Sequence, residues 1–263
     1  MKGFLEEYGL IIVVVAVILL MLLFGKTGYA KSIQDAILGS ADHIVETGDN
    51  ITKSDKKEVN VIAGDMLDIE GTKYVVLEKQ GNYQALVMTA SSIGRKAFQS
   101  KYTFSTKLRP DGQRANTYEG SDIDNYLEND WYNSLSSTMK AAIQTTNIKQ
   151  ASYSDDSPDT KQETGYNGQV YNTISRHTFL PSVSEIGKAV DLKNQFCVNN
   201  FLKGTTIQTR DSSRHSEDSL EMLNTYFCKL GYTTVSNEVN VRPAFVVDLS
   251  KVDYTVAGHE NYK

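Results

Sequence analysis

The chain has 263 residues, with 27 lysines and arginines against 32 aspartates and glutamates, so its formal net charge is −5 at pH 7. This length allows one medium domain plus an appendage. Proteins that bind nucleic-acid backbones usually carry a basic surface, so the acidic balance argues against nucleic acid as a partner. Apolar residues make up 40% of the chain, but they are distributed unevenly along it.

The segment from Leu10 to Phe24 contains no polar side chain. Together with Gly9 it would form a helix about 24 Å long, somewhat short of the roughly 30 Å hydrocarbon core of a bilayer. Tyr8 and Tyr29 flank the segment at positions where aromatic residues lie at membrane interfaces. We therefore expect a single membrane-spanning helix.

A cleavable signal peptide is the alternative, because Gly28-Tyr29-Ala30 offers small residues for cleavage after Ala30. The region before the apolar segment contains one lysine and two glutamates, whereas a secretory signal has a net positive charge. This difference favours an anchor that is retained.

Apolar and small residues recur at helical spacing from Tyr29 to Ile44, so the apolar helix is expected to continue as an amphipathic one and to end near Gly48. Residues 49–58 are charged and show no periodicity, which is typical of a linker. The chain therefore divides into a helical segment (1–48), a linker (49–58) and a head domain (59–263).

The sequence Glu7-Tyr8-Gly9-Leu10-Ile11, followed by the aliphatic segment and the amphipathic helix, resembles the Flp-type pilins of tight-adherence pili. The resemblance implies that Glu7 and Tyr8 act in assembly, with Glu7 neutralising the N-terminal amine of a neighbouring subunit. Its partners would be identical subunits, through the N-terminal helix, and the membrane before assembly.

The N-terminus also departs from that family. Prepilin peptidases usually cut after glycine, and a cut after Gly3 would leave Glu7 as the fourth residue rather than the fifth. The lysines are more numerous after the apolar segment than before it, which by the positive-inside rule would place the C-terminal part in the cytoplasm. A plain membrane anchor with solvated Glu6 and Glu7 therefore stays open as an alternative.

The head is expected to begin with three strands and to end with one. Two strands lie between Val59 and Glu78 and turn at Glu70-Gly71, and a third spans Gln84 to Ala90. An apolar strand spans Val241 to Ser250, with Pro243 near its start.

Helices are expected between these strands. Ser121 is a good N-cap for the first helix, and a second covers Ser137 to Thr145. A long surface loop follows over residues 150–175, and then a short helix capped by Ser182 or Ser184. The alternation of helices and strands predicts an α+β fold class for the head.

Several segments of the head resemble, in their order, an uncharacterised domain common on bacterial surface proteins, over about residues 59–250. They include Tyr74-Val75-Val76-Leu77, Ser121-Asp122-Ile123, Phe179-Leu180-Pro181-Ser182 and Val241-Arg242-Pro243-Ala244. More distantly, the segment from Leu180 to Glu185 and the terminal strand resemble elements of the sulfatase-modifying and C-type-lectin-like folds. This likeness implies an extracytoplasmic head with a C-type-lectin-like architecture.

Little in the head predicts catalysis. Cys197 and Cys228 are too few and too far apart for a metal or redox motif, and they form either a disulfide that closes a loop of about 30 residues or two buried thiols. No pair of histidines has the spacing of a zinc site. We expect no enzymatic activity, no metal and no cofactor.

The densest polar run, residues 210–218, predicts ligand contact by Arg210, Asp211 and Arg214, with a solvated loop or a weak calcium site as alternatives. Trp131, the one tryptophan, can stack on a sugar ring together with its neighbours Tyr126 and Tyr132, or can belong to the core.

Together these features predict a pilin-like filament subunit of a bacterial surface or pilus, inserted in the membrane before assembly. Its head would serve adhesion by binding carbohydrate or a host surface ligand. A membrane-anchored binding protein that does not polymerise is the first alternative, and an enzyme related to the sulfatase-modifying group is the second.

Overall fold

The computed structural model describes residues 59–154, 158–190, 206–224 and 229–259, all within one compact unit, Glu58–Lys263. Strands make up 42% of the described residues and helices 18%. The head is therefore mainly β, and the α+β fold class expected from the sequence is wrong. In the described ranges no helix is long and apolar enough to cross a membrane. The expected N-terminal helix (1–48) and linker (49–58) lie outside those ranges.

A six-stranded antiparallel sheet joins the first and last strands of the head, in the order β14-β1-β2-β3-β13-β5. Its strands are β1 (Asp65–Ile69), β2 (Thr72–Gln80), β3 (Gln84–Thr89), β5 (Ile143–Gln144), β13 (Ala244–Asp248) and β14 (Tyr254–His259). The β1–β2 turn lies at Glu70 (φ 52°) and Gly71 (φ 78°), where the sequence predicted it. Two consecutive positive φ angles are typical of the tight hairpin turn that matches the twist of the strands.

Both faces of this sheet are covered by apolar side chains. Tyr74, Val75, Val76 and Leu77 of β2 are all buried, and consecutive side chains of a strand point to opposite faces. Val75 and Leu77 therefore join one core cluster, while Tyr74 and Val76 join the other. Burial on both faces explains why this strand has an unbroken apolar sequence.

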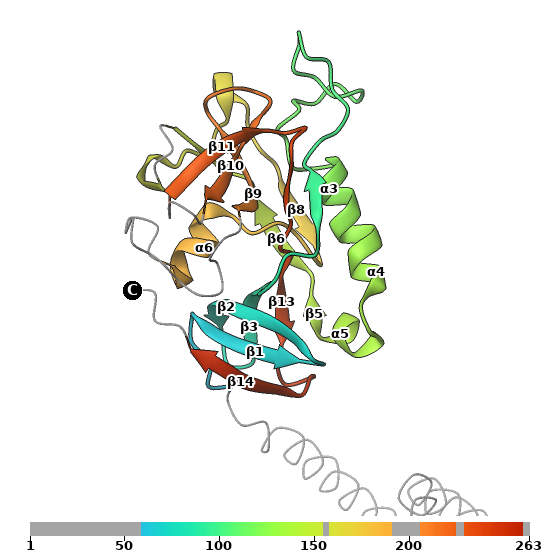
Figure 1. The fold of residues 1–263 in the computed structure, drawn as a ribbon, viewed down its shortest axis with the longest axis vertical. Helices are drawn as coiled ribbons and strands as arrows, with labels where there is room; N and C mark the ends of the chain where they lie inside the picture. Colours follow the sequence, from blue (N-terminus) through green and yellow to red (C-terminus); the bar gives the residue numbers. More distant parts are fainter. Residues whose placement is uncertain (1–58, 155–157, 191–205, 225–228, 260–263) are drawn as a thin grey trace, which may run out of the picture. The chain divides into compact units, whose positions relative to one another are not determined.

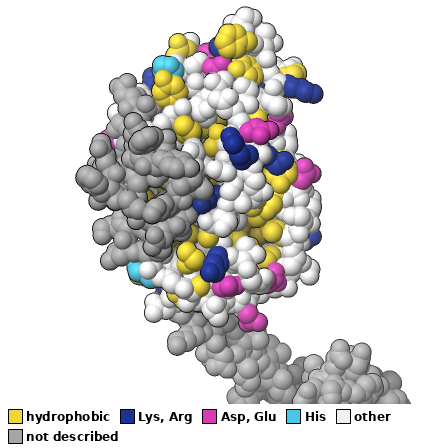
Figure 2. Space-filling view, viewed as in Figure 1, with side chains coloured by type: hydrophobic (Ala, Val, Ile, Leu, Met, Phe, Trp, Pro, Cys, Tyr) yellow, Lys and Arg dark blue, Asp and Glu magenta, His cyan; other side chains and the backbone are white. Residues whose placement is uncertain are grey.

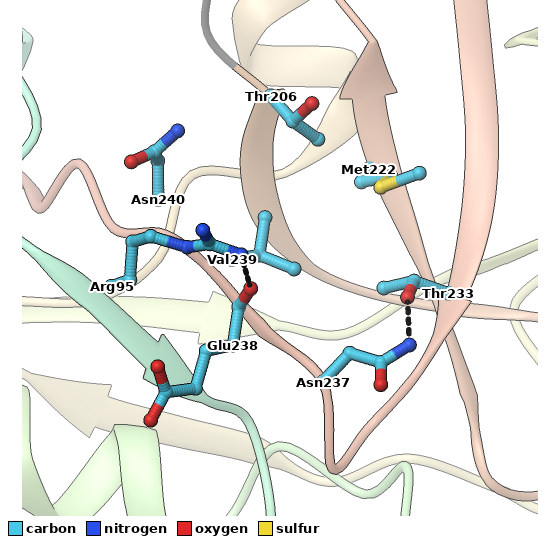
Figure 3. Close-up of a pocket in the computed structure, with 8 residues that line it drawn as sticks. All are labelled: Arg95, Thr206, Met222, Thr233, Asn237, Glu238, Val239 and Asn240. Atoms are coloured by element: carbon cyan, nitrogen blue, oxygen red, sulfur yellow. Dashed lines mark hydrogen bonds between the residues drawn. The ribbon is translucent and has the colours of Figure 1, made fainter.

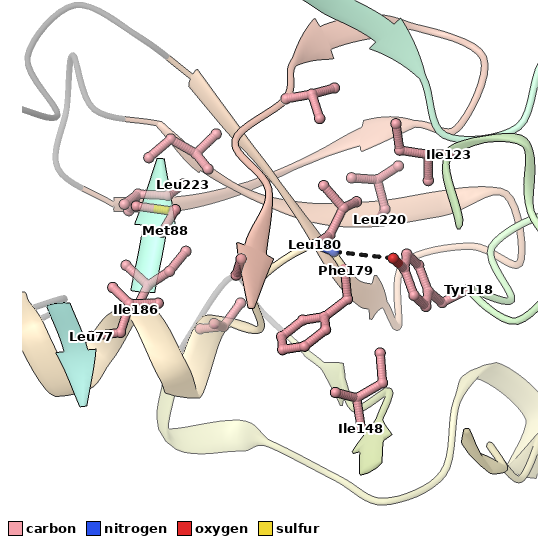
Figure 4. Packing of buried hydrophobic residues seen from close by; sticks show 14 of the residues in the cluster. Leu77, Met88, Tyr118, Ile123, Ile148, Phe179, Leu180, Ile186, Leu220 and Leu223 are labelled. Atoms are coloured by element: carbon pink, nitrogen blue, oxygen red, sulfur yellow. Dashed lines mark hydrogen bonds between the residues drawn. The ribbon is translucent and has the colours of Figure 1, made fainter. Parts of the chain in front are cut away.

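The first of these clusters fills the space between the two large sheets (Figure 4). Leu77 and Met88 come from the first sheet, and Leu220 and Leu223 come from the second. A buried hydrogen bond crosses this apolar region, in which the amide of Leu180 donates to the Tyr118 hydroxyl at 3.0 Å.

The second large sheet has the order β11-β10-β9-β12-β4, and β7 pairs with β9 in parallel. Its strands are β4 (Arg95–Ala97), β7 (Ser152–Tyr153), β9 (Thr206–Ser213), β10 (Ser219–Asn224), β11 (Lys229–Thr234) and β12 (Glu238–Asn240). A separate pair consists of β6 (Thr146–Lys149) and β8 (Thr173–Arg176).

The polar sequence of strand β9 explains why the sequence predicted fewer strands than the structure contains. From Ile207 to Ser213 its residues are buried, although all but Ile207 are polar. From Thr209 to Ser213 the polar side chains have hydrogen-bond partners inside the protein, whereas the Gln208 amide has none among the described residues. A strand buried along almost its whole length lacks the alternation of apolar and polar residues by which half-buried strands are recognised. The sequence Arg210 to Ser213 therefore suggested a surface loop.

Short helices complete the head: α3 (Asp122–Asn125), the π-helical turn η1 (Tyr126–Trp131), α4 (Tyr132–Ser134), α5 (Ser137–Ala142), α6 (Val183–Ala189) and the 3-10 turns η2 (Pro158–Thr160) and η3 (Tyr166–Gly168). Ser121 caps α3 as predicted, because its hydroxyl accepts the amide of Asp124. Ser182 and Glu185 form a reciprocal capping box at α6. Figure 1 shows α3 to α5 along one side of the head, and α6 packs against β2, β9 and β10.

On the face drawn in Figure 2, positive and negative side chains of the described residues are interspersed rather than gathered by sign.

Candidate functional site

The pocket that we consider the candidate site contains Trp131 and has a volume of about 530 Å³. Three segments build its walls: the β1–β2 turn with the start of β2, the end of β3 with the chain after it, and the helical segment around Trp131. The lining residues are Gly71, Thr72, Lys73, Tyr74, Thr89, Ser91, Ser92, Ile93, Trp131 and Leu135. We call this space the Trp131 pocket.

Aromatic packing holds the indole of Trp131 in place. Its ring centroid lies 6.0 Å from that of Phe245, and Tyr74 meets the same Phe245 edge-on at 5.3 Å. Trp131 is half-buried and packs against both core clusters. The indole therefore packs against the core and also lines the pocket.

An exposed hydrogen bond links the segments that form two of the pocket walls. The Ser136 hydroxyl donates to the carboxylate of Glu70 at 2.7 Å, and it accepts the amide of Met139 at 3.0 Å as the N-cap of α5. Glu70 directly precedes Gly71, and Ser136 directly follows Leu135. One side chain thus ties the β1–β2 turn to the helical wall.

The polar side chains that line the Trp131 pocket are the hydroxyls of Thr72, Thr89, Ser91 and Ser92, the phenol of Tyr74 and the ammonium group of Lys73. Thr89 is only 3% exposed, and within the described residues its hydroxyl has no hydrogen-bond partner. Burial raises the pKa of the Tyr74 phenol by more than a hydrogen bond with Thr72 lowers it. This phenol therefore stays neutral at pH 7. Apolar rings and small hydroxyls thus line a single space.

A second pocket of about 460 Å³ lies between β4 and β12 on one side and β9, β10 and β11 on the other (Figure 3). Its lining residues are Arg95, Thr206, Met222, Thr233, Asn237, Glu238, Val239 and Asn240, none of them aromatic. Arg95 donates to the backbone carbonyl of Glu238 at 2.7 Å, and Asn237 donates to the Thr233 hydroxyl at 2.9 Å. Because its lining has no aromatic ring, we favour the Trp131 pocket as the candidate site.

The structure places Arg210 and Asp211 inside the head. Two nitrogens of the Arg210 guanidinium each lie 2.7 Å from the carboxylate of Glu185. The Asp211 carboxylate accepts the amides of Ala151 at 2.9 Å and Val183 at 2.7 Å. Both side chains are buried and contact protein partners, so we do not assign ligand contact to them.

Arg214 directly follows the buried stretch from Ile207 to Ser213. It is partly exposed, and its amide donates to the carbonyl of Tyr153 at 2.7 Å. Of the four residues for which the sequence predicted ligand contact, Trp131 alone lines the candidate pocket. Glu7, Tyr8, Cys197 and Cys228 lie outside the described residues.

Sequence reasoning did not single out Thr72, Thr89, Ser91 or Ser92. A weak signal was present, because small hydroxyl residues cluster directly after the apolar sequence of β3. Their proximity to Trp131 depends on contacts between segments about 40 to 60 residues apart, which a local pattern does not reveal. In the described ranges, no group of three or more His, Cys, Asp or Glu side chains could hold a metal ion.

Residues 86–249, more than half of the chain, match the model of a family described as "Domain of unknown function (DUF6273)". The chain belongs to this family. The DUF6273 region includes the pocket walls formed by Thr89 to Ile93 and by Trp131 and Leu135, whereas the wall from Gly71 to Tyr74 precedes it. No curated protein matches the chain, and no solved structure matches it.

Proposed function

We propose that this DUF6273 protein is a bacterial surface subunit whose head binds carbohydrate in the Trp131 pocket. The observation that carries the proposal is the combination of an indole with small hydroxyls in one space of about 530 Å³. Ligand pockets are usually apolar concavities with a few polar groups that fix orientation. A volume in this range suits a small organic ligand.

The chemistry of the lining matches that of a sugar ring. A pyranose has an apolar face of C–H groups and a rim of hydroxyls. The face of an indole binds the first, and threonine and serine hydroxyls bind the second because they both donate and accept hydrogen bonds. Trp131 supplies the stacking surface, and Ser91 and Thr72 supply hydroxyls at the exposed part of the lining.

The N-terminal sequence supports display at a surface. The apolar segment from Leu10 to Phe24 suits membrane insertion, and Glu7-Tyr8 ahead of it resembles the assembly signal of Flp-type pilins. We therefore propose a filament subunit that carries the head. Replacement of Glu7 by alanine tests polymerisation, with sheared surface fractions imaged for filaments. Filaments from the wild type alone would support the pilin role, and equal filaments, or none from either protein, would contradict it.

Carbohydrate binding is tested by tryptophan fluorescence, because Trp131 is the one tryptophan of the chain and therefore reports on the pocket directly. The purified full chain is titrated with oligosaccharides of neutral hexoses, N-acetylhexosamines and hexuronic acids. We expect a saturable change in emission with at least one class. No change with any of the three classes would contradict carbohydrate binding.

Two variants locate the binding. Ser91→Leu adds bulk at an exposed lining position, so it should weaken binding at least tenfold without disturbing the core. Phe104→Ala removes a ring that is 74% exposed and does not line the pocket, and it should leave the affinity unchanged. Unchanged affinity in Ser91→Leu would exclude the Trp131 pocket as the site.

A further inference from the structure

A chain of hydrogen bonds links Glu128, His177 and Thr145, none of which lines the Trp131 pocket. His177 Nδ1 lies 2.7 Å from Glu128 Oε1, and His177 Nε2 lies 3.2 Å from the hydroxyl oxygen of Thr145. The three residues come from different segments: the π-helical turn η1, the end of β8 and the connection between β5 and β6. The order carboxylate, imidazole, hydroxyl is the arrangement that activates a nucleophile.

The carboxylate determines which ring nitrogen of His177 carries the proton. An ionised carboxylate only accepts hydrogen bonds, so we assign the proton to Nδ1. Nε2 then has a free lone pair and accepts the hydrogen bond of the Thr145 hydroxyl. In this tautomer His177 is placed to remove the Thr145 proton.

Both the carboxylate and the ring are held in position. Glu128 Oε2 accepts the backbone amides of His177 at 2.8 Å and Thr178 at 3.2 Å, so donors contact both of its oxygens. The His177 ring stacks on Tyr132, with centroids 4.5 Å apart and planes 15° apart. The Thr145 end of the chain is exposed, and the His177 side chain is 34% exposed, so a small molecule in solution can reach them.

We propose that Thr145 is an activated nucleophile that takes an acyl group from small activated esters. The Thr145 oxygen attacks the ester carbonyl carbon while its proton passes to His177 Nε2. The tetrahedral intermediate then collapses, the bond to the leaving alkoxide breaks, and that alkoxide leaves with the proton from His177. The acyl group remains on Thr145 as a new ester, and Glu128 acts as a positioning residue for the imidazole.

The exposure of Thr145 limits the expected rate. Water solvates the oxyanion that forms during the attack, so the site gains from general-base assistance but not from an enclosed oxyanion hole. We therefore expect Thr145 to react at least about tenfold faster than an ordinary threonine, a figure below the typical range for general-base catalysis.

The test uses the full chain incubated with p-nitrophenyl acetate, followed by peptide mass spectrometry to locate stable acetyl groups. An exposed imidazole also attacks this ester, but its acyl adduct hydrolyses, so the stable adduct on threonine is the readout. Thr145→Ala should abolish the adduct on its peptide. Thr146→Ala is the matched control, because the Thr146 hydroxyl donates to the carbonyl of Gln144 and should not affect labelling of Thr145.

His177→Gln should slow acetylation of Thr145 at least tenfold. Glu128→Gln should also slow it and shift the His177 ring nitrogens away from the Nδ1–H tautomer in nitrogen NMR, which a purely structural role would not require. Acetylation of Thr145 no faster than that of Thr146 would overturn the proposal. Equal rates in wild type and His177→Gln would also overturn it.

Discussion

The guanidinium of Arg210 and the carboxylate of Glu185 form a two-pronged ion pair inside the head, with two N–O distances of 2.7 Å. Burial alone would raise the pKa of Glu185, but the charge and hydrogen bonds of Arg210 hold it below its ordinary value. Glu185→Gln leaves Arg210 buried without its counter-charge, so we expect a loss of about 3 kcal/mol in the free energy of unfolding, measured with urea.

An exposed ion pair in the same head provides the comparison. Lys188 contacts Glu78 where both side chains are at least one-third exposed. Glu78→Gln should change the free energy of unfolding by less than about 1 kcal/mol, because water screens this pair. A similar loss in Glu185→Gln and Glu78→Gln would show that burial does not set the strength of the Arg210 contact.

The raised pKa of Asp211 predicts a pH dependence of stability whose sign is opposite to that of a carboxylate with a lowered pKa, such as Glu185. Burial raises its pKa from 3.8 to about 6, against the lowering effects of Arg210 and of the Ala151 and Val183 amides. The folded state therefore binds a proton that the unfolded state releases, and stability falls as the pH rises from about 4 to about 6. A pKa shift of this size corresponds to a loss of up to about 3 kcal/mol in the free energy of unfolding.

Asp211→Asn checks this prediction, because the variant cannot titrate. Urea unfolding of the wild type at pH 5 and pH 7 should show lower stability at pH 7, and the difference should shrink in Asp211→Asn. The pKa of Glu185 is lowered, so its contribution is lost only as the pH falls below its ordinary value of 4.5 and does not mask the effect. Equal pH dependence in wild type and variant would contradict the assignment to Asp211.

Gly165 is required by a close approach rather than by an unusual backbone angle. Its φ is −78°, but a Cβ at this position would overlap the hydroxyl of the buried Tyr171, which itself bonds to Ser212. Gly165→Ala should lower the free energy of unfolding by about 2 kcal/mol, as overpacking does. At Gly258 a Cβ would meet nothing within 4 Å, so Gly258→Ala should change the free energy of unfolding by less than about 0.5 kcal/mol. Thermal melts of both variants and the wild type measure the difference.

Ser136 caps α5 and also links the helical wall of the Trp131 pocket to the β1–β2 turn. Ser136→Ala removes both its N-cap bond and its contact with Glu70, so we expect a loss of about 1 kcal/mol. Ser137→Ala, one residue into the helix, keeps both bonds and should cost nothing measurable. If the two variants melt at the same temperature, the link between the pocket walls is not stabilising.

Local signals in the sequence were sufficient for several elements. The Glu70-Gly71 turn and the Ser121 cap were predicted correctly, and Ser182 is one of the two caps that the sequence offered for α6. β13 begins directly after Pro243, as expected for a residue that cannot donate to a sheet. Each of these features depends on a few neighbouring residues, which is why the sequence alone identifies it.

The features that the sequence did not reveal depend on distant partners. β9 is a polar strand whose Arg210 and Asp211 are stabilised by segments up to 60 residues away, so its pattern was typical of a loop. β14 is largely exposed and shows no apolar alternation. Trp131 was recognised because it is unique in composition, but the hydroxyls around it come together only in the folded chain.

The pairing of β1 with β14 also constrains how the head forms during synthesis. Asp65 and His259 are 194 residues apart in sequence, yet their side chains meet at 2.7 Å in one sheet. While the chain emerges from the ribosome, β1 to β3 must wait for β13 and β14, and their apolar side chains stay uncovered until then. Such long-range pairing folds slowly, so a chaperone that shields the nascent β1 to β3 segment should raise the yield of native protein.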